Sequence, residues 1–313
     1  MSTINRAAIA SALVPGVHEI VGLSYGDTPM EHAPMYDTLN SKRAFEEEVM
    51  YGGTGGAVQS GEGGAVTYDS IQELWTARYQ HETYKLGLKF TKEAFDDDLY
   101  DVIGQAKGQE LGTSMADTKQ VKACATFNRG FNPAYAIGDG QALFSATHPM
   151  ANGDTFSNLS SSELSESALE DICISISKMT NDRGILISAR AESIHIPADL
   201  EFDIHRILKS ESSVTPMTST AGGATRVSNK NDVNVLRTSG KFPKGIFVNR
   251  RLNDPDAWYV RTSIPNGTKM FVREALQGSS DNNFDTDDLL IKYRERYSFG
   301  VTNPRQWFAS AGS

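Results

Sequence analysis

Two segments near the N-terminus predict strands, and a glycine-rich loop joins them. Residues 45–51 form the first, and the second, over residues 65–92, alternates polar and apolar positions in part, with Leu86 and Phe90 on one face. Between them, Gly52 to Gly64 contains seven glycines in thirteen residues. Glycine at this density loses entropy on ordering without a side chain to pack, so we expect something outside the subunit to order the loop.

From Lys92 to about Ala125 the apolar spacing becomes helical, and no proline interrupts it. Asp96–Asp98 would occupy the first turn, where the helix dipole favours negative charge. At 1.5 Å per residue, about 30 residues form a helix about 45 Å long. Gly104, Gly108 and Gly112 recur every four residues. They line one stripe of the helix, and they either permit the close approach of another element or mark a bend.

Shorter elements fill the rest of the chain. A short helix over Asn5–Leu13 ends at Pro15–Gly16, and prolines keep the chain after it extended. Residues 127–162 are rich in loop residues, and a helix follows over Ser165–Met179 with Ser165 as its cap.

The C-terminal half predicts mainly strands. A helix opens at Pro197 and runs to Leu208, and the polar segment Ser212–Val227 is expected to be mobile. Strands are expected over Ser193–Ile196, Val233–Arg237, Gly245–Val248, Trp258–Thr262, Lys269–Ala275 and Leu289–Ser298.

Charge and composition exclude several classes of protein. The net charge of −9 argues against a nucleic-acid-binding surface, because such a surface needs a basic face. No run approaches the roughly 18 apolar residues of a membrane span. Cys124 and Cys173 are too few for a disulfide framework or a metal cluster, so a reducing compartment fits best.

Catalytic, cofactor and metal motifs are missing, so we expect no enzyme, no cofactor and no metal. The glycine loop does not suit phosphate, because Glu62 lies where an anion would sit and residues 44–77 contain no Lys or Arg. His148 could serve a hydrolase with a Ser or Cys nucleophile, although a loop histidine that bonds backbone next to Pro149 is the simpler interpretation. Cys124 and Cys173 both read as small buried hydrophobes.

The order of these elements resembles the major capsid proteins of tailed phages. An extended arm, a long glycine-tipped hairpin, a long helix, a compact mixed region and returning strands follow one another in the Hong Kong 97-type fold. Three motifs look closest to the Mu-type major head subunit family, and they are Ala142–Pro149 (ALFSATHP), Trp258–Thr262 with Gly267–Ala275 (WYVRT, GTKMFVREA) and Lys292–Trp307 (KYRERYSFGVTNPRQW). The resemblance implies an α+β fold.

The resemblance also implies a division into parts. Residues 1–40 would be the N-terminal arm, and 41–78 the extended E-loop. Residues 79–126 and 264–299 would form the peripheral domain with its long spine helix, and 127–263 and 300–313 the axial domain.

The E-loop of such a subunit gains its stabilisation by lying over a neighbouring copy. The residues expected to make this contact are Glu46, Glu47, Glu48, Tyr51, Gly52, Gly53, Gly55, Gly56, Gly61, Glu62, Gly63, Gly64 and Tyr68. Some relatives crosslink the shell through an E-loop lysine, but residues 44–77 have no lysine, so we expect non-covalent contacts alone.

The implied function is a major capsid protein that forms pentamers and hexamers of an icosahedral shell around double-stranded DNA, without sequence-specific binding. Its partners would be copies of itself, with separate scaffolding and portal proteins and a possible cement protein, and no membrane. It would reside in the virion after assembly in the bacterial host cytoplasm. An encapsulin-like compartment of the same fold is the alternative, and a monomeric binding module or a hydrolase using His148 are remote ones.

Overall fold

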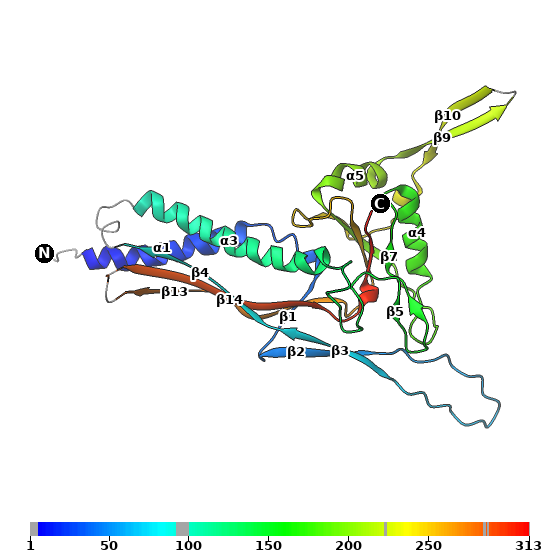
Figure 1. The fold of residues 1–313 in the computed structure, drawn as a ribbon, viewed down its shortest axis with the longest axis horizontal. Helices are drawn as coiled ribbons and strands as arrows, with labels where there is room; N and C mark the ends of the chain where they lie inside the picture. The colour runs from blue at the N-terminus through cyan, green and yellow to red at the C-terminus, as the bar shows by residue number, and fades with distance from the viewer. Residues whose placement is uncertain (1–5, 92–99, 222–223, 284–285, 287, 313) are drawn as a thin grey trace. The chain divides into compact units, whose positions relative to one another are not determined.

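The chain forms two compact units, each assembled from segments that are far apart in the sequence (Figure 1). The computed structural model describes residues 6–91, 100–221, 224–283, 286 and 288–312. The first unit comprises Met1–Glu47, Arg78–Thr126 and Lys269–Gly300, and the second comprises Glu48–Ala77, Phe127–Thr268 and Val301–Ser313. Helices and sheets occur in both units, so the expected α+β class is confirmed.

The first unit is a four-stranded sheet covered by two long helices. Its strands, in the order β1-β13-β14-β4, are Asp37–Asn40, Thr268–Asn282, Leu289–Val301 and Glu82–Phe90. β1 runs parallel to β13, whereas β14 runs antiparallel to β4. The helices α1 (Arg6–Asp27) and α3 (Tyr100–Asn128) lie side by side along the sheet (Figure 1). The core between helices and sheet is built from Val17, Val21, Leu111, Ile291 and Tyr293.

The glycine stripe of α3 allows α1 to approach closely. A Cβ added at Gly112 would lie 2.6 Å from the backbone oxygen of Val21, and one at Gly108 would lie 3.3 Å from Ile20 Cγ2. Of the two roles that the spacing allowed, close approach is therefore confirmed at these two positions. The first residues of the predicted helix, with Asp96–Asp98, lie outside the described residues.

The N-terminal helix is longer than the sequence predicts. The short helix expected to end at Pro15–Gly16 instead continues to Asp27. A proline inside a helix removes one backbone hydrogen bond and costs about 3 kcal/mol. Burial of Val17 and Val21 against the rest of the unit offsets this cost, and that burial is invisible in the local pattern. A 3-10 turn, η1 (Ala33–Met35), then leads into β1.

The second unit is built around a five-stranded sheet in the order β11-β8-β12-β15-β7. These strands are Gly245–Val248, Ala191–Ile196, Trp258–Thr262, Trp307–Ser310 and Leu159–Ser160. Every residue of β12 is buried, as its central place in the sheet requires. The helix α4 (Glu166–Ser177) packs Leu169, Ile172 and Ile176 into the core of this unit.

Several elements of the second unit agree with the sequence. Ser165 caps α4 by accepting a hydrogen bond from the backbone N–H of Ala168, as predicted. The helix expected from Pro197 forms as a 3-10 turn, η2 (Ala198–Leu200), followed by α5 (Glu201–Lys209). Residues 127–162 are mainly loop, with the small pair β5 (His148–Pro149) and β6 (Thr155–Phe156). The strand β15 was not expected.

One expectation in the second unit was wrong, and another is not tested. The described residues of the polar segment Ser212–Val227 lie in β9 (Ser212–Ala221) and β10 (Ala224–Val233), which pair as a hairpin, and the mobility expected of this segment stays a prediction. The strand expected at Val233–Arg237 is instead a helical turn, α6 (Val235–Thr238). Its cause is local, because the side chain of Asn234 accepts a hydrogen bond from Arg237 N and caps the turn.

The second predicted strand is also divided. Residues 65–72 are irregular, and the strand expected from there on is interrupted at His81, which separates β3 (Glu73–Gln80) from β4. Its expected last residue, 92, lies outside the described residues. The imidazole of His81 is buried between two hydroxyls, Ser41 Oγ at 2.9 Å and Ser298 Oγ at 3.0 Å. These contacts hold His81 at the point where β3 ends and β4 begins.

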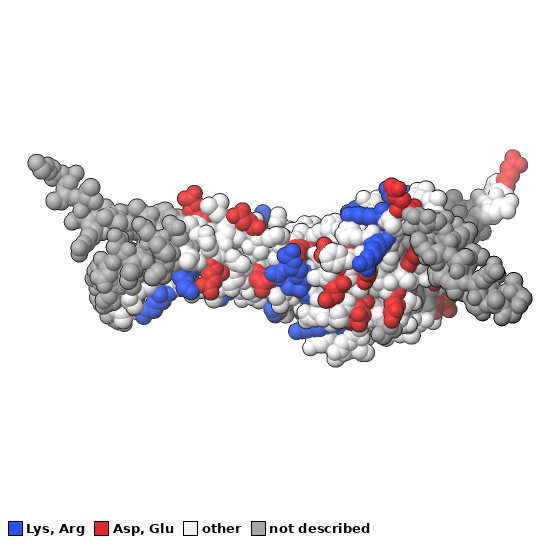
Figure 2. All heavy atoms as spheres, turned by 90° about the horizontal axis from the view of Figure 1, so that it is seen from above, with Lys and Arg blue, Asp and Glu red and all other residues white. Residues whose placement is uncertain are grey.

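The surface carries charges of both signs. On the face shown in Figure 2, basic and acidic side chains are interspersed, without an unbroken basic field. Among the helices of the described residues, none is both long enough and apolar enough to cross a membrane.

Candidate functional site

A long loop at the end of a two-stranded hairpin is the main candidate site. The strands β2 (Phe45–Tyr51) and β3 pair with each other, and Gly52 N closes the hairpin by donating to Gln72 O at 2.8 Å. The residues between these two, 53–71, contain no strand or helix. We refer to residues 52–72 as the 52–72 loop.

The 52–72 loop and the end of β2 expose large apolar side chains. Tyr68 is 91% exposed, Val66 73% and Val58 70%, and Ile71 and Tyr51 are also more than half exposed. A group of exposed apolar side chains on one segment indicates a surface that another molecule covers. This observation comes from the structure, because the sequence analysis concentrated on the glycines and the acidic residues.

The three glutamates of β2 have partners at the base of the hairpin. Glu46 accepts a hydrogen bond from Ser41 Oγ at 2.7 Å, and Glu47 lies 3.8 Å from Arg78. Glu48 accepts one from Thr302 Oγ1 at 3.0 Å. The expected contact residues Glu46, Glu47 and Glu48 therefore hold the hairpin within the chain, and any contact they make with a neighbour is additional to this role.

The outer part of the loop is open to solvent. Gly56, Gly61, Glu62, Gly63 and Gly64 are all exposed. Gly63 has a φ of +79°, which an L side chain rarely adopts, and Gly64 N closes the turn by donating to Gly61 O at 2.9 Å. Glycine is thus required at Gly63 by the backbone, whereas Gly56 and Gly61 have open space around them.

The inner part of the loop contacts residues that the sequence analysis missed. The side chains of Asn181 and Arg183 reach the backbone of Thr54 and Ser70, and Arg183 also pairs with Asp69 at 3.1 Å. Hydrogen bonds from the backbone N–H of Gly55 and Ser70, together with Arg183, hold the pKa of Asp69 below its ordinary value. 

The sequence Asn181–Gly184 (NDRG) does signal a turn, but nothing local shows that this turn meets a loop more than a hundred residues away.

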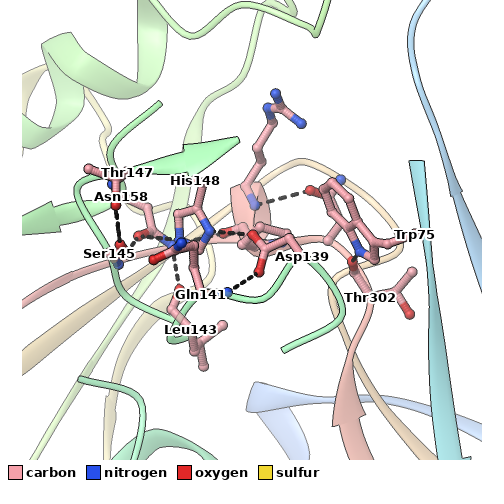
Figure 3. A network of polar contacts seen from close by, with 12 residues as sticks. Trp75, Asp139, Gln141, Leu143, Ser145, Thr147, His148, Asn158 and Thr302 are labelled. Atoms are coloured by element: carbon pink, nitrogen blue, oxygen red, sulfur yellow. Dashed lines mark hydrogen bonds and ion pairs between the residues drawn. The ribbon is translucent and has the colours of Figure 1, made fainter. Parts of the chain in front are cut away.

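His148 lies in a second cluster, which is buried (Figure 3). Its Nδ1 is 2.6 Å from Asp139 Oδ2 and its Nε2 is 3.1 Å from Asn158 Oδ1, while the ring stacks on Phe156. Asn158 in turn accepts from Ser145 N and donates to Leu143 O, so the cluster ties together loop segments. Since both ring nitrogens are occupied and the ring is fully buried, His148 has the geometry of a structural residue.

This arrangement differs from both sequence interpretations of His148. The imidazole bonds side chains rather than backbone, and its Nε2, which a hydrolase would direct at a Ser or Cys nucleophile, faces the amide oxygen of Asn158. In the same region, Trp75 Nε1 donates to Thr302 O at 3.0 Å and fixes β3 to the C-terminal segment (Figure 3).

The other candidate ligands do not converge. Within the part of the chain that the structure describes, no group of three or more His, Cys, Asp or Glu side chains could hold a metal ion. Cys124 is fully buried, as expected, whereas Cys173 is only partly buried against the core, where burial raises the pKa of its thiol. Asp288, whose carboxylate could otherwise be a metal ligand, pairs with Lys89 at 2.6 Å.

Comparison with known families gives one match. The model of a family described as phage capsid protein matches residues 73–310, which begins at the first residue of β3 and ends at the last residue of β15. The 52–72 loop lies before the matched region. A comparison with curated proteins finds no match.

Solved structures of similar fold are particles and capsids. The procapsid of bacteriophage JBD30 matches with 14% identity and a TM-score of 0.53, covering 97% of this chain and 75% of that one. Mycobacterium phage Patience matches with 13% identity and a TM-score of 0.53, covering 96% and 88%. A virus-like particle from Pyrococcus furiosus matches with 8% identity and a TM-score of 0.50, covering 94% and 97%. At these identities the likeness shows the fold, which is the Hong Kong 97 type.

Proposed function

The chain belongs to the phage capsid protein family, whose model it matches over residues 73–310, and from this premise we propose how it builds a shell. We propose that it is the major head subunit, which assembles with copies of itself into pentamers and hexamers around double-stranded DNA. In this proposal residues 1–40 are the arm and 41–78 the E-loop. Residues 79–126 and 264–299 form the peripheral domain, and 127–263 and 300–313 the axial domain.

The observation that carries this proposal is the uncovered apolar surface of the 52–72 loop. Val58, Val66, Tyr68 and Ile71 are each more than 60% exposed, although large apolar side chains normally gain free energy by burial. Because aromatic residues are enriched in protein interfaces, Tyr68 is the strongest candidate anchor. A neighbouring copy that covers the loop would provide the missing burial.

The same loop determines which kind of bond holds the shell. Residues 44–77 have no lysine, so a lysine isopeptide cannot form from this segment. The contacts proposed for Tyr51 and the loop glycines are therefore apolar and hydrogen-bonded. Glycine at Gly56 and Gly61 would allow one sequence to fit both pentamers and hexamers, which present different geometries.

The proposed partners follow from the role of a container. We expect separate scaffolding and portal proteins, and a cement protein where the shell is reinforced, with assembly in the host cytoplasm. The net charge of −9 fits a shell that does not hold its genome tightly, because tight phosphate binding needs many cations. A catalytic role is not part of this proposal, and the buried geometry of His148 supports a structural one.

An encapsulin-like compartment is the alternative with the same fold. The likeness to a virus-like particle fits either container, whereas the family match favours the phage capsid. The contents of the particle distinguish the two, because a phage head encloses DNA and a compartment encloses an enzyme.

The first prediction is that the purified chain assembles. We expect electron microscopy and sedimentation to show closed particles, tubes or rings of five and six subunits. Tyr68→Ser should weaken assembly because it removes the most exposed apolar side chain of the loop, whereas Ser60→Ala, a small change in the same loop, serves as the control. A chain that sediments as a 34.1 kDa monomer under all conditions would refute the shell.

A further inference from the structure

Both arms of the 52–72 loop meet the same turn of their own subunit. On the first arm, Asn181 Nδ2 donates to Thr54 O at 3.2 Å. On the second arm, a guanidinium nitrogen of Arg183 donates to Ser70 O at 3.0 Å and lies 3.1 Å from Asp69 Oδ1. Both arms of the loop are therefore bound at their base to one turn, residues 181–184.

A single carboxylate also joins the two arms to each other. Asp69 Oδ2 accepts a hydrogen bond from Gly55 N at 2.6 Å, while its other oxygen faces Arg183. The carboxylate of Asp69 therefore links Gly55 on the first arm to Arg183 on the turn at residues 181–184. We call this set of contacts, Asn181–Thr54, Arg183–Ser70 and Asp69 with Gly55 and Arg183, the clasp.

The turn that carries the clasp is closed by hydrogen bonds of its own. Asn181 Oδ1 accepts hydrogen bonds from the backbone N–H groups of Arg183 and Ile185, both at 2.9 Å. Gly184 has a φ of +82°, and Asn181 N donates to Ile185 O at 2.7 Å. These bonds fix the amide of Asn181 in the orientation in which its Nδ2 reaches the loop.

A buried ion pair fixes the same turn to the sheet. Arg305 lies 2.9 Å from Asp182 Oδ1, and both side chains are only 2% exposed. The guanidinium of Arg305 also stacks over Phe156, 4.3 Å from the ring centroid. The backbone oxygen of Arg305 accepts a hydrogen bond from Thr262 Oγ1 on β12. Asn181 and Arg183, on either side of Asp182, contact the loop. Asp182 itself is held by its buried ion pair with Arg305, which is costly to break.

The loop has no room for a side chain where it meets Asn181. A Cβ added at Gly53 would lie 2.3 Å from Asn181 Nδ2 and 2.9 Å from Asn181 Cγ. At Gly56, three residues further along, a Cβ would have open space. Of these two positions, only Gly53 requires a glycine for packing.

We propose that Asn181 and Arg183 are positioning residues, which set the direction of the 52–72 loop in the free subunit before the loop meets a neighbouring copy. The proposal rests on the proposed function, because it assumes that the loop covers a neighbour. A loop whose base is already oriented loses less entropy on docking than one that is free at its base. Since exposed ion pairs contribute little stability, the clasp can adjust when the neighbour offers a larger interface.

The test compares the variants Gly53→Ala and Arg183→Ala with Gly56→Ala as the matched control. Hydrogen exchange of the free subunit reports the clasp directly through the amide of Gly55. Light scattering and electron microscopy report the rate of assembly and the uniformity of the particles. The thermal midpoint is measured as well, because a purely structural role of these residues would lower it.

We expect Gly53→Ala and Arg183→Ala to lose protection at Gly55 and to assemble more slowly into less uniform particles, at an unchanged thermal midpoint. Gly56→Ala should behave like the wild-type chain in every measurement. The proposal is overturned by a wild-type subunit whose Gly55 amide exchanges freely, or by clasp variants that lose protection but assemble normally. A wild-type chain that never assembles would refute the proposed function instead, whatever the protection at Gly55.

Discussion

At the scale of single residues, the first unit contains a buried charged pair. Lys119 Nζ lies 2.7 Å from Glu295 Oε2, with side chains 10% and 1% exposed. Tyr25 joins them, because its hydroxyl donates to Glu295 and accepts from Lys119. Burial, followed by the charge of Glu295, raises the pKa of Tyr25. The three residues come from α1, α3 and β14, so the cluster links both helices to the sheet.

Removing one charge of this pair should destabilise the first unit strongly. We expect Lys119→Met to lower the free energy of unfolding by about 3–5 kcal/mol, because Glu295 is then a buried charge without its cation. The control is Lys122→Met, one turn further along α3, since Lys122 lies 3.5 Å from Glu82 in an exposed pair. Its effect should stay below about 1 kcal/mol. Urea denaturation measures the free energy of unfolding of both variants. Equal losses in the two variants would contradict a buried pair at Lys119 and an exposed pair at Lys122.

At the scale of elements, periodicity predicted the strands and helices whose formation depends on local pattern. The α3 helix, the cap at Ser165 and β12 follow from spacing and capping alone. The continuation of α1 through Pro15 does not, because it depends on burial against residues far along the chain. At Asn234, a single hydrogen bond to the capping side chain stabilises a helical turn where a strand was expected. The periodicity of apolar residues does not reveal such a cap.

The candidate site, too, could be predicted from the sequence only in part. The glycine-rich composition of residues 52–64 identified the loop, and its acidic character followed from a count of side chains. The clasp could not be predicted, because Arg183 and Asp69 are brought together only by the folded second unit. The exposure of Tyr68 likewise depends on which residues the rest of the chain leaves uncovered.

The packing of α1 against α3 allows a test with paired glycine substitutions. Gly112→Ala places a Cβ 2.6 Å from the backbone oxygen of Val21, so α1 has to shift and we expect a loss of stability of about 1–3 kcal/mol. Gly22→Ala lies in α1 with open space around it and should stabilise the protein by up to about 1 kcal/mol. Thermal unfolding measures both. A stabilising Gly112→Ala would show that the two helices are not in close contact.

At the scale of the whole molecule, each compact unit contains a histidine that the fold keeps neutral. In the first unit, burial and then the charge of Lys119 lower the pKa of His32 to about 4. In the second, burial and then the charge of Arg261 lower the pKa of His195 to about 3. His195 is fully buried between the rings of Phe247 and Trp307, each 5.0 Å away between ring centroids.

These two histidines make the stability of the molecule depend on pH. Both folded pKa values lie below the value of 6.5 for an unperturbed histidine, so between pH 6.5 and 4 the unfolded state binds more protons than the folded one. Stability must then rise with pH across this window and fall as pH drops below 6.5. Each histidine contributes a slope of up to about 1.4 kcal/mol per pH unit.

The prediction is therefore a loss of stability between pH 6.5 and 5, above the range in which most carboxylates titrate. Urea denaturation at several pH values measures the slope for each unit. His195→Gln should remove the part of the pH slope that comes from the second unit and leave the part from the first, because Gln does not gain a proton. Gln can still form a hydrogen bond with Ser193, which lies 3.0 Å from His195 Nε2. If His195→Gln leaves the slope unchanged, other groups cause the acid sensitivity. If the free energy of unfolding of the wild-type protein stays constant between pH 6.5 and 5, the burial of both imidazoles is contradicted.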